Sequence, residues 1–162
     1  MAEAILSLGG NIGPARETID RAVKVLCDGE HVRLLARSSD YRSAPWGVID
    51  QPPFVNLCLI VATTLSARAL LARAQAIETA LGRIRESERR WGPRVIDIDV
   101  ISYDNLVITE ADFALPHPHA LERAFVLMPL NEIAPDRTIG GVTVREALAR
   151  LDITGVERLP PR

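Results

Sequence analysis

The chain has 162 residues, of which 48% are hydrophobic and 25% are charged, and its formal net charge at pH 7 is −2. This length is typical of one domain with a single core, and the composition excludes disordered and fibrous proteins. The small negative charge does not indicate a protein that binds nucleic acid or an anionic membrane. The longest apolar run, residues 57–62, is far shorter than the ~20 residues that cross a bilayer.

Two features indicate where the protein works. The first residues, Met-Ala-Glu, lack the basic start of a secretory signal peptide. Cys27 and Cys58 stand in apolar surroundings without the CxxC spacing of redox or zinc sites, so we expect free, buried thiols in a reducing compartment. Both features favour a cytoplasmic protein.

Hydrophobic periodicity and turn residues predict six main elements. In chain order these are a strand at 4–8, a helix at 15–27, strands at 32–41 and 54–64, a helix capped by Ser66 that ends near Gly82, and a strand at 95–103. Further elements follow: a short hairpin around Val107, a helix at 121–130, a turn at Gly140-Gly141, and a helix that a capping box at Thr143 and Glu146 opens and that ends at Leu151.

The order βαββαβ predicts an α+β fold. It matches the ferredoxin-like sandwich, in which a four-stranded antiparallel sheet carries two helices on one face. The C-terminal helices and the hairpin are additions to that core, and we predict a single domain over residues 1–162. Two connections, 43–53 and 82–94, are longer than their neighbouring elements require, which is typical of functional loops.

A pair of carboxylates is the most informative feature of the sequence. Asp97 and Asp99 alternate with Ile96 and Ile98, so on a strand both carboxylates lie on one face, roughly 7 Å apart. A solvent-facing strand side is the simple alternative. Because like charges on one face repel and Asp is a poor strand former, we favour a site for hard cations such as Mg²⁺.

The residues before this strand are rich in arginine. Five arginines fall within 12 residues: Arg83, Arg85, Arg89, Arg90 and Arg94. They form either a solvated charged face or a site for a polyanion, because guanidinium groups fit phosphate oxygens. Together with the two carboxylates, they favour a site for metal and phosphate.

Asn56 is a polar residue in a strand that is apolar on both faces. Its amide is satisfied either by a polar network in the core or by a flat heterocycle with paired donors and acceptors. Trp46 and Trp91, in irregular segments, add weight to the heterocycle, since aromatic residues there often stack on ligands. His117 and His119 have no cysteine or third histidine near them in sequence, so a zinc site is not expected.

The segment Arg90-Trp-Gly-Pro-Arg-Val-Ile-Asp-Ile-Asp-Val-Ile101 resembles the signature of the 6-hydroxymethyl-7,8-dihydropterin pyrophosphokinases of folate synthesis. Five further segments match the family in order: Ser7-Leu-Gly-Gly-Asn11, Tyr41-Arg-Ser-Ala-Pro-Trp-Gly47, Asp50-Gln-Pro-Pro-Phe-Val-Asn56, Leu115-Pro-His117 and Arg123-Ala-Phe125. Six motifs in family order, over nearly the whole chain, make a specific resemblance.

The resemblance implies a ferredoxin-like enzyme that moves pyrophosphate from ATP to the hydroxymethyl group of the pterin and releases AMP. It implies two Mg²⁺ ions on Asp97 and Asp99, and a catalytic group made up of Arg85, Arg94, Asp97 and Asp99. The positions that match ATP contacts are Gln75, Glu78, Arg85, Arg90, Trp91, Arg94, Ile98 and His117. The positions that match the pterin pocket are Ser43, Ala44, Trp46, Phe54, Asn56, Arg123 and Phe125. The substrates are the only partners expected, and the chain is expected to be a monomer.

Some positions depart from the family pattern. Glu86 stands in place of a lysine, Asp112 and Ala114 replace an Arg and a Thr near the nucleotide, and Pro118 replaces an aromatic residue. These departures bear on loop closure and ATP affinity. Two other functions remain open from the residues themselves: a different Mg²⁺-dependent phosphotransferase or nucleotidyltransferase, and a non-catalytic ligand-binding module.

Overall fold

The computed structural model describes residues 1–45, 50–84 and 92–162. The first seven elements are β1 (Ala2–Gly10), α1 (Ala15–Leu26), β2 (Val32–Arg37), β3 (Tyr41–Ser43), β4 (Phe54–Thr63), α2 (Ala67–Ala80) and β5 (Asp97–Tyr103). The later ones are β6 (Ile108–Thr109), β7 (Ala114–Leu115), the short 3-10 helix η2 (Ala120–Glu122), α3 (Ala124–Ile133), β8 (Thr138–Ile139), β9 (Val142–Thr143), α4 (Val144–Ala149) and β10 (Val156–Arg158).

The main sheet is antiparallel and has the order β10-β3-β4-β1-β5, with β2 also paired to β4. The α+β class and the βαββαβ order of the first 103 residues are confirmed. The expectation of four strands is wrong, because the sheet of the described residues has six. The additional strands arise where one predicted strand divides in two and where the C-terminal β10 adds to the edge.

The strand predicted at 32–41 is interrupted at residues 38–40. The register of β2 on β4 shifts between Leu34 and Ala36, and β3 resumes the pairing from Tyr41. At the interruption Ser38 accepts a hydrogen bond on its Oγ from the Cys58 backbone N–H and donates its own N–H to the Cys58 carbonyl. The polar Ser38 therefore holds the break against β4, and β2 and β3 lie along the same neighbour.

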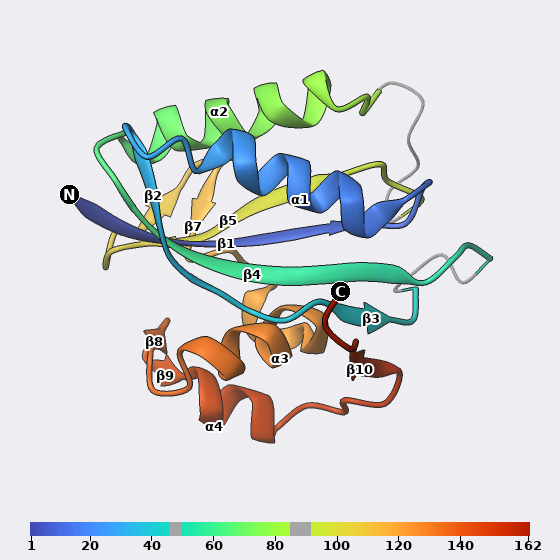
Figure 1. Cartoon of the computed structure of the whole chain (residues 1–162). Coiled ribbons are helices and arrows are strands. Elements are labelled where there is room, and N and C mark those ends of the chain that lie inside the picture. The colour runs from blue at the N-terminus through green and yellow to red at the C-terminus, as the bar shows by residue number, and fades with distance from the viewer. Residues whose placement is uncertain (46–49, 85–91) are drawn as a thin grey trace.

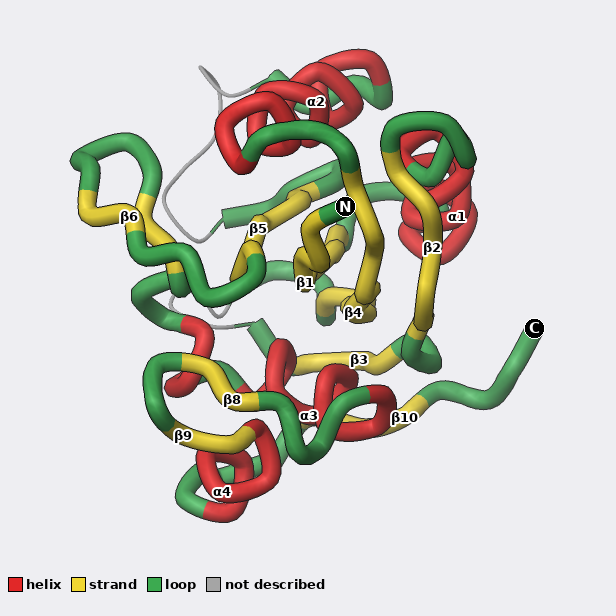
Figure 2. The backbone as a smooth tube through the Cα atoms, turned by 90° about the vertical axis from the view of Figure 1, so that its left-hand side faces the viewer, coloured by secondary structure: helices red, strands yellow, loops and turns green. Residues whose placement is uncertain are grey.

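Helices cover both faces of the sheet. Figure 1 shows α1 and α2 above the sheet and α3 and α4 below it, and Figure 2 shows the same layers from the side. The upper core contains Leu6, Leu57 and Val100, and the lower core contains Cys58 and Ile101. Because successive residues of a strand face opposite ways, β4 and β5 serve both cores and are apolar on both sides where helices cover them.

Local signals explain most element boundaries. Ser66 caps α2 by accepting the Ala69 N–H, and Thr143 caps α4 by accepting the Glu146 N–H, as predicted. The hairpin expected around Val107 lies further along the chain, because β6 begins at Ile108 and pairs with β7. No helix among the described residues is long and apolar enough to cross a membrane.

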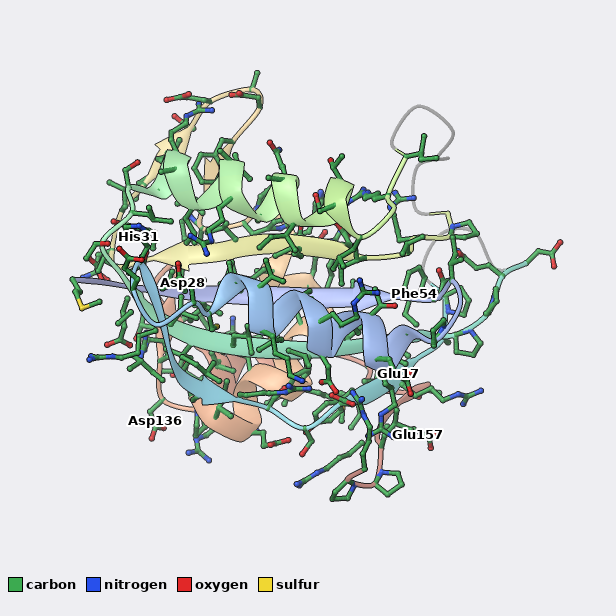
Figure 3. The ribbon with its side chains drawn as sticks, turned by 45° about the horizontal axis from the view of Figure 1, so that its top comes forward. Glu17, Asp28, His31, Phe54, Asp136 and Glu157 are labelled. Atoms are coloured by element: carbon green, nitrogen blue, oxygen red, sulfur yellow. The ribbon has the colours of Figure 1, made fainter. Side chains whose placement is uncertain are left out.

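The turn between α1 and β2 is organised by one carboxylate. Asp28 Oδ1 accepts the backbone N–H groups of Glu30, His31 and Val32, and Oδ2 accepts a hydrogen bond from Arg73. These four interactions hold the pKa of Asp28 well below its usual range. Figure 3 shows Asp28 and His31 together at this end of the molecule, away from Phe54.

Candidate functional site

The polar residues of three neighbouring strands form rows on the face that α3 covers. Gly9 of β1 pairs with Asn56 of β4 on one side and with Asp97 of β5 on the other. Two residues away, Ser7 pairs with Asp99. Paired residues of an antiparallel sheet share a face, so Ser7, Asn56 and the two aspartates lie on the same face of the sheet. This face becomes polar toward the C-terminal end of β1 and the N-terminal ends of β4 and β5.

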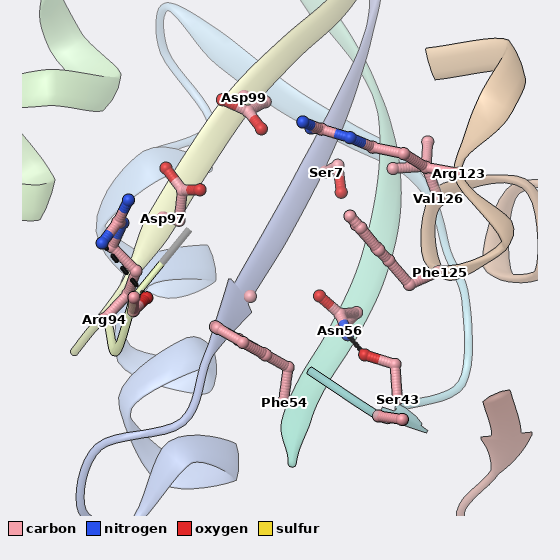
Figure 4. A pocket seen from close by; sticks show the side chains of 13 residues that line it. Ser7, Ser43, Phe54, Asn56, Arg94, Asp97, Asp99, Arg123, Phe125 and Val126 are labelled. Atoms are coloured by element: carbon pink, nitrogen blue, oxygen red, sulfur yellow. Dashed lines mark hydrogen bonds between the residues drawn. The ribbon is translucent and has the colours of Figure 1, made fainter. Parts of the chain in front are cut away.

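A cavity of about 110 Å³ lies over this polar region. Figure 4 shows that β1, β3, β4, β5 and the start of α3 all contribute to it. Its lining consists of Ser7, Gly9, Ser43, Ala44, Phe54, Asn56, Gly92, Arg94, Asp97, Asp99, Arg123, Phe125 and Val126. The cavity thus unites predicted residues from both halves of the sequence.

One end of the cavity combines an amide with two aromatic rings. Asn56 Nδ2 donates to Ser43 Oγ at 2.7 Å, and Asn56 is only 7% exposed. Figure 4 shows Phe54 and Phe125 on either side of Asn56. An amide flanked by rings offers hydrogen bonds at the edge of a flat ligand and apolar surface to its faces.

Gly9 makes room for the amide. A Cβ at this position would lie 2.5 Å from Asn56 Oδ1, which is too close for a side chain of any size. Gly10 is similar, since its Cβ would lie 2.5 Å from the Val95 carbonyl oxygen. The Gly-Gly pair that ends the first predicted strand therefore allows β1 to pass close to Asn56 on one side and to the Val95 backbone on the other.

The other end of the cavity carries the two carboxylates. Burial, and then the negative charge of Asp97, raise the pKa of Asp99 to about 8. The Arg123 guanidinium points toward Asp99 in Figure 4 and lies over the Phe125 ring, with Cζ 5.5 Å from the ring centroid. Its positive charge opposes the shift of Asp99. A cation bound here would relieve the repulsion between the two carboxylates.

His117 lies beside the carboxylates without lining the cavity. Its Nε2 is 4.0 Å from Asp99 Oδ2, and its Nδ1 accepts the backbone N–H of His119 at 3.2 Å. An accepting Nδ1 assigns the ring proton to Nε2, which faces the carboxylate. Burial, and then the positive charge of Arg123, lower the pKa of His117 to about 4, so the ring is neutral at physiological pH.

Glu78, at the end of α2, and Arg83 form an ion pair next to β5. Arg83 donates to Glu78 Oε2 at 2.6 Å and to Asp97 Oδ1 at 2.8 Å, and the same Glu78 oxygen accepts the Ile98 backbone N–H at 2.8 Å. Glu78 is 1% exposed and Ile98 is 3% exposed. Glu78 therefore supports the strand that carries the aspartates, and Ile98 belongs to the upper core. The contact of Arg83 with Asp97 could not be predicted from the arginine cluster alone.

Asn11, the last residue of the Ser7–Asn11 segment, joins the two long connections, a role that the sequence did not predict. Its Nδ2 donates to Gln51 Oε1 and to the Pro52 carbonyl, and its Oδ1 accepts the Arg94 backbone N–H. The Arg94 carbonyl accepts the N–H groups of Asn11 and Ile12 in turn. Asn11 is only 6% exposed, and a polar residue directly after the Gly-Gly pair was the available signal.

The predicted site residues fall into three groups. Nine line the cavity: Ser43, Ala44, Phe54, Asn56, Arg94, Asp97, Asp99, Arg123 and Phe125. Four of the predicted ATP contacts do not line it: Gln75, which is exposed on α2, and Glu78, Ile98 and His117. Trp46, Arg85, Arg90 and Trp91, together with the departure at Glu86, lie outside the described residues.

The departure at Asp112 has a local partner. Arg68 of α2 donates to both carboxylate oxygens of Asp112, at 2.9 and 3.1 Å, and its guanidinium lies 5.3 Å from the centroid of the Phe113 ring. Where the family pattern has an arginine, this chain has the acidic half of an ion pair with the helix. Ala114 begins β7, and Pro118 separates the two histidines.

Comparison with known proteins identifies relatives of the whole chain. A family model described as 7,8-dihydro-6-hydroxymethylpterin-pyrophosphokinase matches residues 5–135. The 2-amino-4-hydroxy-6-hydroxymethyldihydropteridine pyrophosphokinase of Methylorubrum extorquens is 51% identical over 159 residues, which is 98% of this chain and 99% of the relative. The protein of the same name from Pseudomonas aeruginosa is 40% identical over 156 residues, covering 96% of this chain and 95% of the relative.

A solved structure supports the fold. The crystal structure of Plasmodium falciparum HPPK-DHPS wild type with SDX-DHP superimposes with a TM-score of 0.73 at 14% sequence identity. The match covers 98% of this chain and 47% of that one, so this chain spans less than half the length of its structural relative. At this identity the similarity is one of fold.

Proposed function

The chain belongs to the 7,8-dihydro-6-hydroxymethylpterin-pyrophosphokinase family, and from that premise we propose that it transfers pyrophosphate from ATP to the hydroxymethyl group of 6-hydroxymethyl-7,8-dihydropterin and releases AMP. It is thus a pyrophosphokinase of folate biosynthesis. The single observation that carries the proposal is one cavity with two chemically different ends, an amide between aromatic rings and a pair of carboxylates among arginines.

The amide end suits the pterin. Asn56 keeps one amide hydrogen and its Oδ1 for a ligand after donating to Ser43, which matches the paired donors and acceptors of a pterin edge. Phe54 and Phe125 supply the apolar surface for the two faces of the ring, and Ala44 adds to the wall. Trp46 is assigned to the same pocket by the family resemblance alone.

The carboxylate end suits divalent cations. Mg²⁺ prefers oxygen ligands and usually binds through one or two carboxylates together with substrate phosphates. Asp97 and Asp99 fit this pattern, because they share one strand face and Asp99 has a raised pKa that a cation would lower. The described residues hold no group of three or more His, Cys, Asp or Glu side chains suited to a metal. We infer that two Mg²⁺ ions bind here with the triphosphate as the other source of oxygen ligands.

The protein contributes positioning and charge rather than covalent chemistry. Asp97 and Asp99 would hold Mg²⁺, which would neutralise charge on the triphosphate and lower the pKa of the attacking hydroxyl. Arg94 and Arg123 line the cavity and can contact phosphate oxygens, and Arg83 adds positive charge at Asp97. Arg85, Arg90, Trp91, Gln75 and His117 are assigned to the ATP side from the family resemblance. No side chain is assigned as a strong general base.

Catalysis by proximity follows if one cavity holds the attacking hydroxyl and the β-phosphorus in line. The entropy cost of bringing the two reactants together is then met on binding, which lowers the activation barrier by about 7 kcal/mol or more in well-oriented systems. Asn11 supports this geometry because it joins the connection before β4 to the backbone of Arg94. We further propose that the 162 residues act as a single domain and as a cytoplasmic monomer.

The test is direct. The purified chain is incubated with ATP, Mg²⁺ and the hydroxymethyl dihydropterin, and the nucleotide products are separated. We expect AMP in equal amount to the pterin pyrophosphate, and no reaction when EDTA is present. Formation of ADP, or turnover that does not require a divalent cation, would contradict the proposal. Failure to bind either substrate would also contradict it.

A further inference from the structure

Glu132 of α3 joins the helix to the segment that precedes the cavity wall. Its Oε2 accepts hydrogen bonds from the Ser39 backbone N–H at 2.9 Å and from Ser39 Oγ at 3.2 Å. Its Oε1 accepts a hydrogen bond from Tyr41 Oη at 2.8 Å. One carboxylate therefore holds three donors from two residues, and all three lie on the chain that enters β3.

The segment held by Glu132 leads straight into the amide end of the cavity. Tyr41 pairs with Asn56 in the sheet, and Ser43 pairs with Phe54. Tyr41 and Ser43 lie on the same face as Asn56, because strand residues two apart share a face. The register of β3 on β4, and the distance between the two strands, therefore determine where Ser43 Oγ meets the Asn56 amide.

The same helix supplies the opposite wall. Phe125 stands in the first turn of α3, and Glu132 follows it by seven residues, two helical turns later. Residues seven apart lie on one side of a helix, so the side of α3 that presents Phe125 also presents Glu132. A rotation or shift of α3 at Glu132 would therefore move Phe125 relative to Asn56.

We propose that Glu132 is a positioning residue for the pterin: it fixes the separation between the β3–β4 wall, with Ser43 and Asn56, and the α3 wall, with Phe125. This inference rests on the proposed function. Glu132 lines no part of the cavity. Its effect is on the shape of the slot that receives the flat ring.

The chemistry of the contact explains why a carboxylate stands at this position. Three donors meet two oxygens, an arrangement that an ionised carboxylate satisfies and a neutral amide does not. Tyr41 is 5% exposed, so removal of Glu132 would leave its hydroxyl buried without this hydrogen-bond partner. Arg158 of β10, with Nε 3.9 Å from Oε1, is the positive group that faces the carboxylate from the neighbouring strand.

Three variants and one control test the proposal. Glu132→Ala removes all three contacts, and Glu132→Gln keeps the length and one acceptor. Tyr41→Phe removes one hydrogen bond and leaves the ring in place. Glu157→Ala is the matched control, since Glu157 is a glutamate of β10 with a 66% exposed side chain that pairs with Arg42 at the surface. For each protein, the dissociation constants of the dihydropterin and of ATP with Mg²⁺ are measured by calorimetry, and the melting temperature is recorded.

For Glu132→Ala we expect pterin binding to weaken by about tenfold, the scale of losing hydrogen bonds to a charged group, with ATP binding within about twofold of wild type. Glu132→Gln should recover part of the loss, and Tyr41→Phe should weaken pterin binding less than Glu132→Ala does. The control should bind both substrates as wild type does. If Glu132→Ala does not fold, Tyr41→Phe carries the same test.

Two results would overturn the inference. Wild-type pterin affinity in both Glu132→Ala and Tyr41→Phe, even with a lowered melting temperature, would reduce Glu132 to a stabilising contact. Equal weakening of pterin and ATP would indicate a general disturbance of the fold. If the wild-type protein itself does not bind the pterin, the proposed function fails and the inference falls with it, so the two failures are distinguishable.

Discussion

The side-chain amide of Asn56 donates a hydrogen bond to Ser43 Oγ over 2.7 Å, and this contact joins β4 to β3 at the wall of the cavity. The two residues are almost fully buried, at 7% and 3% exposure. The contact fixes the orientation of the amide, which lines the cavity and keeps a second N–H and its Oδ1 for a ligand. A structural hydrogen bond and a recognition group are thus combined in one side chain.

Asn56→Ala is expected to weaken pterin binding far more than ATP binding. The donors and acceptors of the bound ring would lose their partner in a desolvated site, at about 1–3 kcal/mol. Ser43→Ala is the matched variant, because it removes only the group that orients the amide, and it should have a smaller effect in the same direction. Calorimetric titration with each substrate measures both. Equal losses for the two substrates would make Asn56 a structural amide.

Asp97→Ala and Asp99→Ala should each reduce turnover by about 10²-fold or more while the fold survives. Asp97→Ala removes an ion-pair partner of the buried Arg83 and should lower the melting temperature, whereas Asp99→Ala removes a carboxyl whose charged form is disfavoured and should leave it unchanged or slightly higher. Asn substitutions should fail similarly, since an amide keeps the shape and loses the charge. The measurements are turnover over a Mg²⁺ titration and thermal melting. Near-normal activity in either Ala variant would refute the two-metal site.

Mg²⁺ binding should release protons near neutral pH. The pKa of Asp99, raised to about 8 by burial and by Asp97, means that this carboxyl holds a proton at pH 7 when no cation is bound. A cation favours the ionised form, so the proton leaves on binding. Calorimetry in two buffers with different ionisation enthalpies measures the release, and Asp99→Asn should abolish it. Equal heats in both buffers for the wild-type protein would contradict the assignment.

The same shift sets a stability trend with the opposite sign to that of an ordinary carboxylate. A folded-state pKa above the unfolded value of 3.8 stabilises the protein fully below that value, and the contribution is lost as the pH rises through about 8. Asp28 behaves in the ordinary way, because its lowered pKa stabilises the protein above 3.8 and the contribution is lost as the pH falls. The two carboxylates therefore affect opposite ends of the pH range.

Asp28→Asn should flatten the acid side of the stability profile. Between about pH 5 and pH 2 the wild-type melting temperature should fall more steeply than that of the variant, since only the wild type loses the charge that the turn stabilises. Glu30→Gln, in the same turn with an 81% exposed side chain, is the control and should follow the wild type. Parallel profiles for wild type and Asp28→Asn would show that the Asp28 charge contributes nothing.

Much of the fold follows from local sequence patterns. Alternating residues such as Ile98 and Asp99 place a strand and assign its two faces, and Ser66 and Thr143 mark two helix starts by their capping chemistry. The break of the second strand at Ser38 is different. It depends on hydrogen bonds to Cys58, which is 20 residues away, and no local pattern contains that partner.

The site shows the same division. Asn56 and Asp97 stand out because a polar residue interrupts an apolar strand. Glu132 does not stand out, since it lies in an ordinary helical pattern, and the position of Asn11 after a glycine pair does not reveal its partners. Both act through residues more than 30 positions away in the chain. Long-range hydrogen bonds of this kind become visible only when the sheet register and helix packing are known.

The most direct test of the central claim follows the phosphates of ATP. ATP labelled separately at the α, β or γ phosphorus is supplied with Mg²⁺ and the hydroxymethyl dihydropterin, and the labelled pterin product is isolated. Pyrophosphoryl transfer predicts that the β and γ labels both appear in the pterin product in equal amount while the α label stays in AMP. Transfer of the γ label alone with ADP as product, or of the α label, would contradict it.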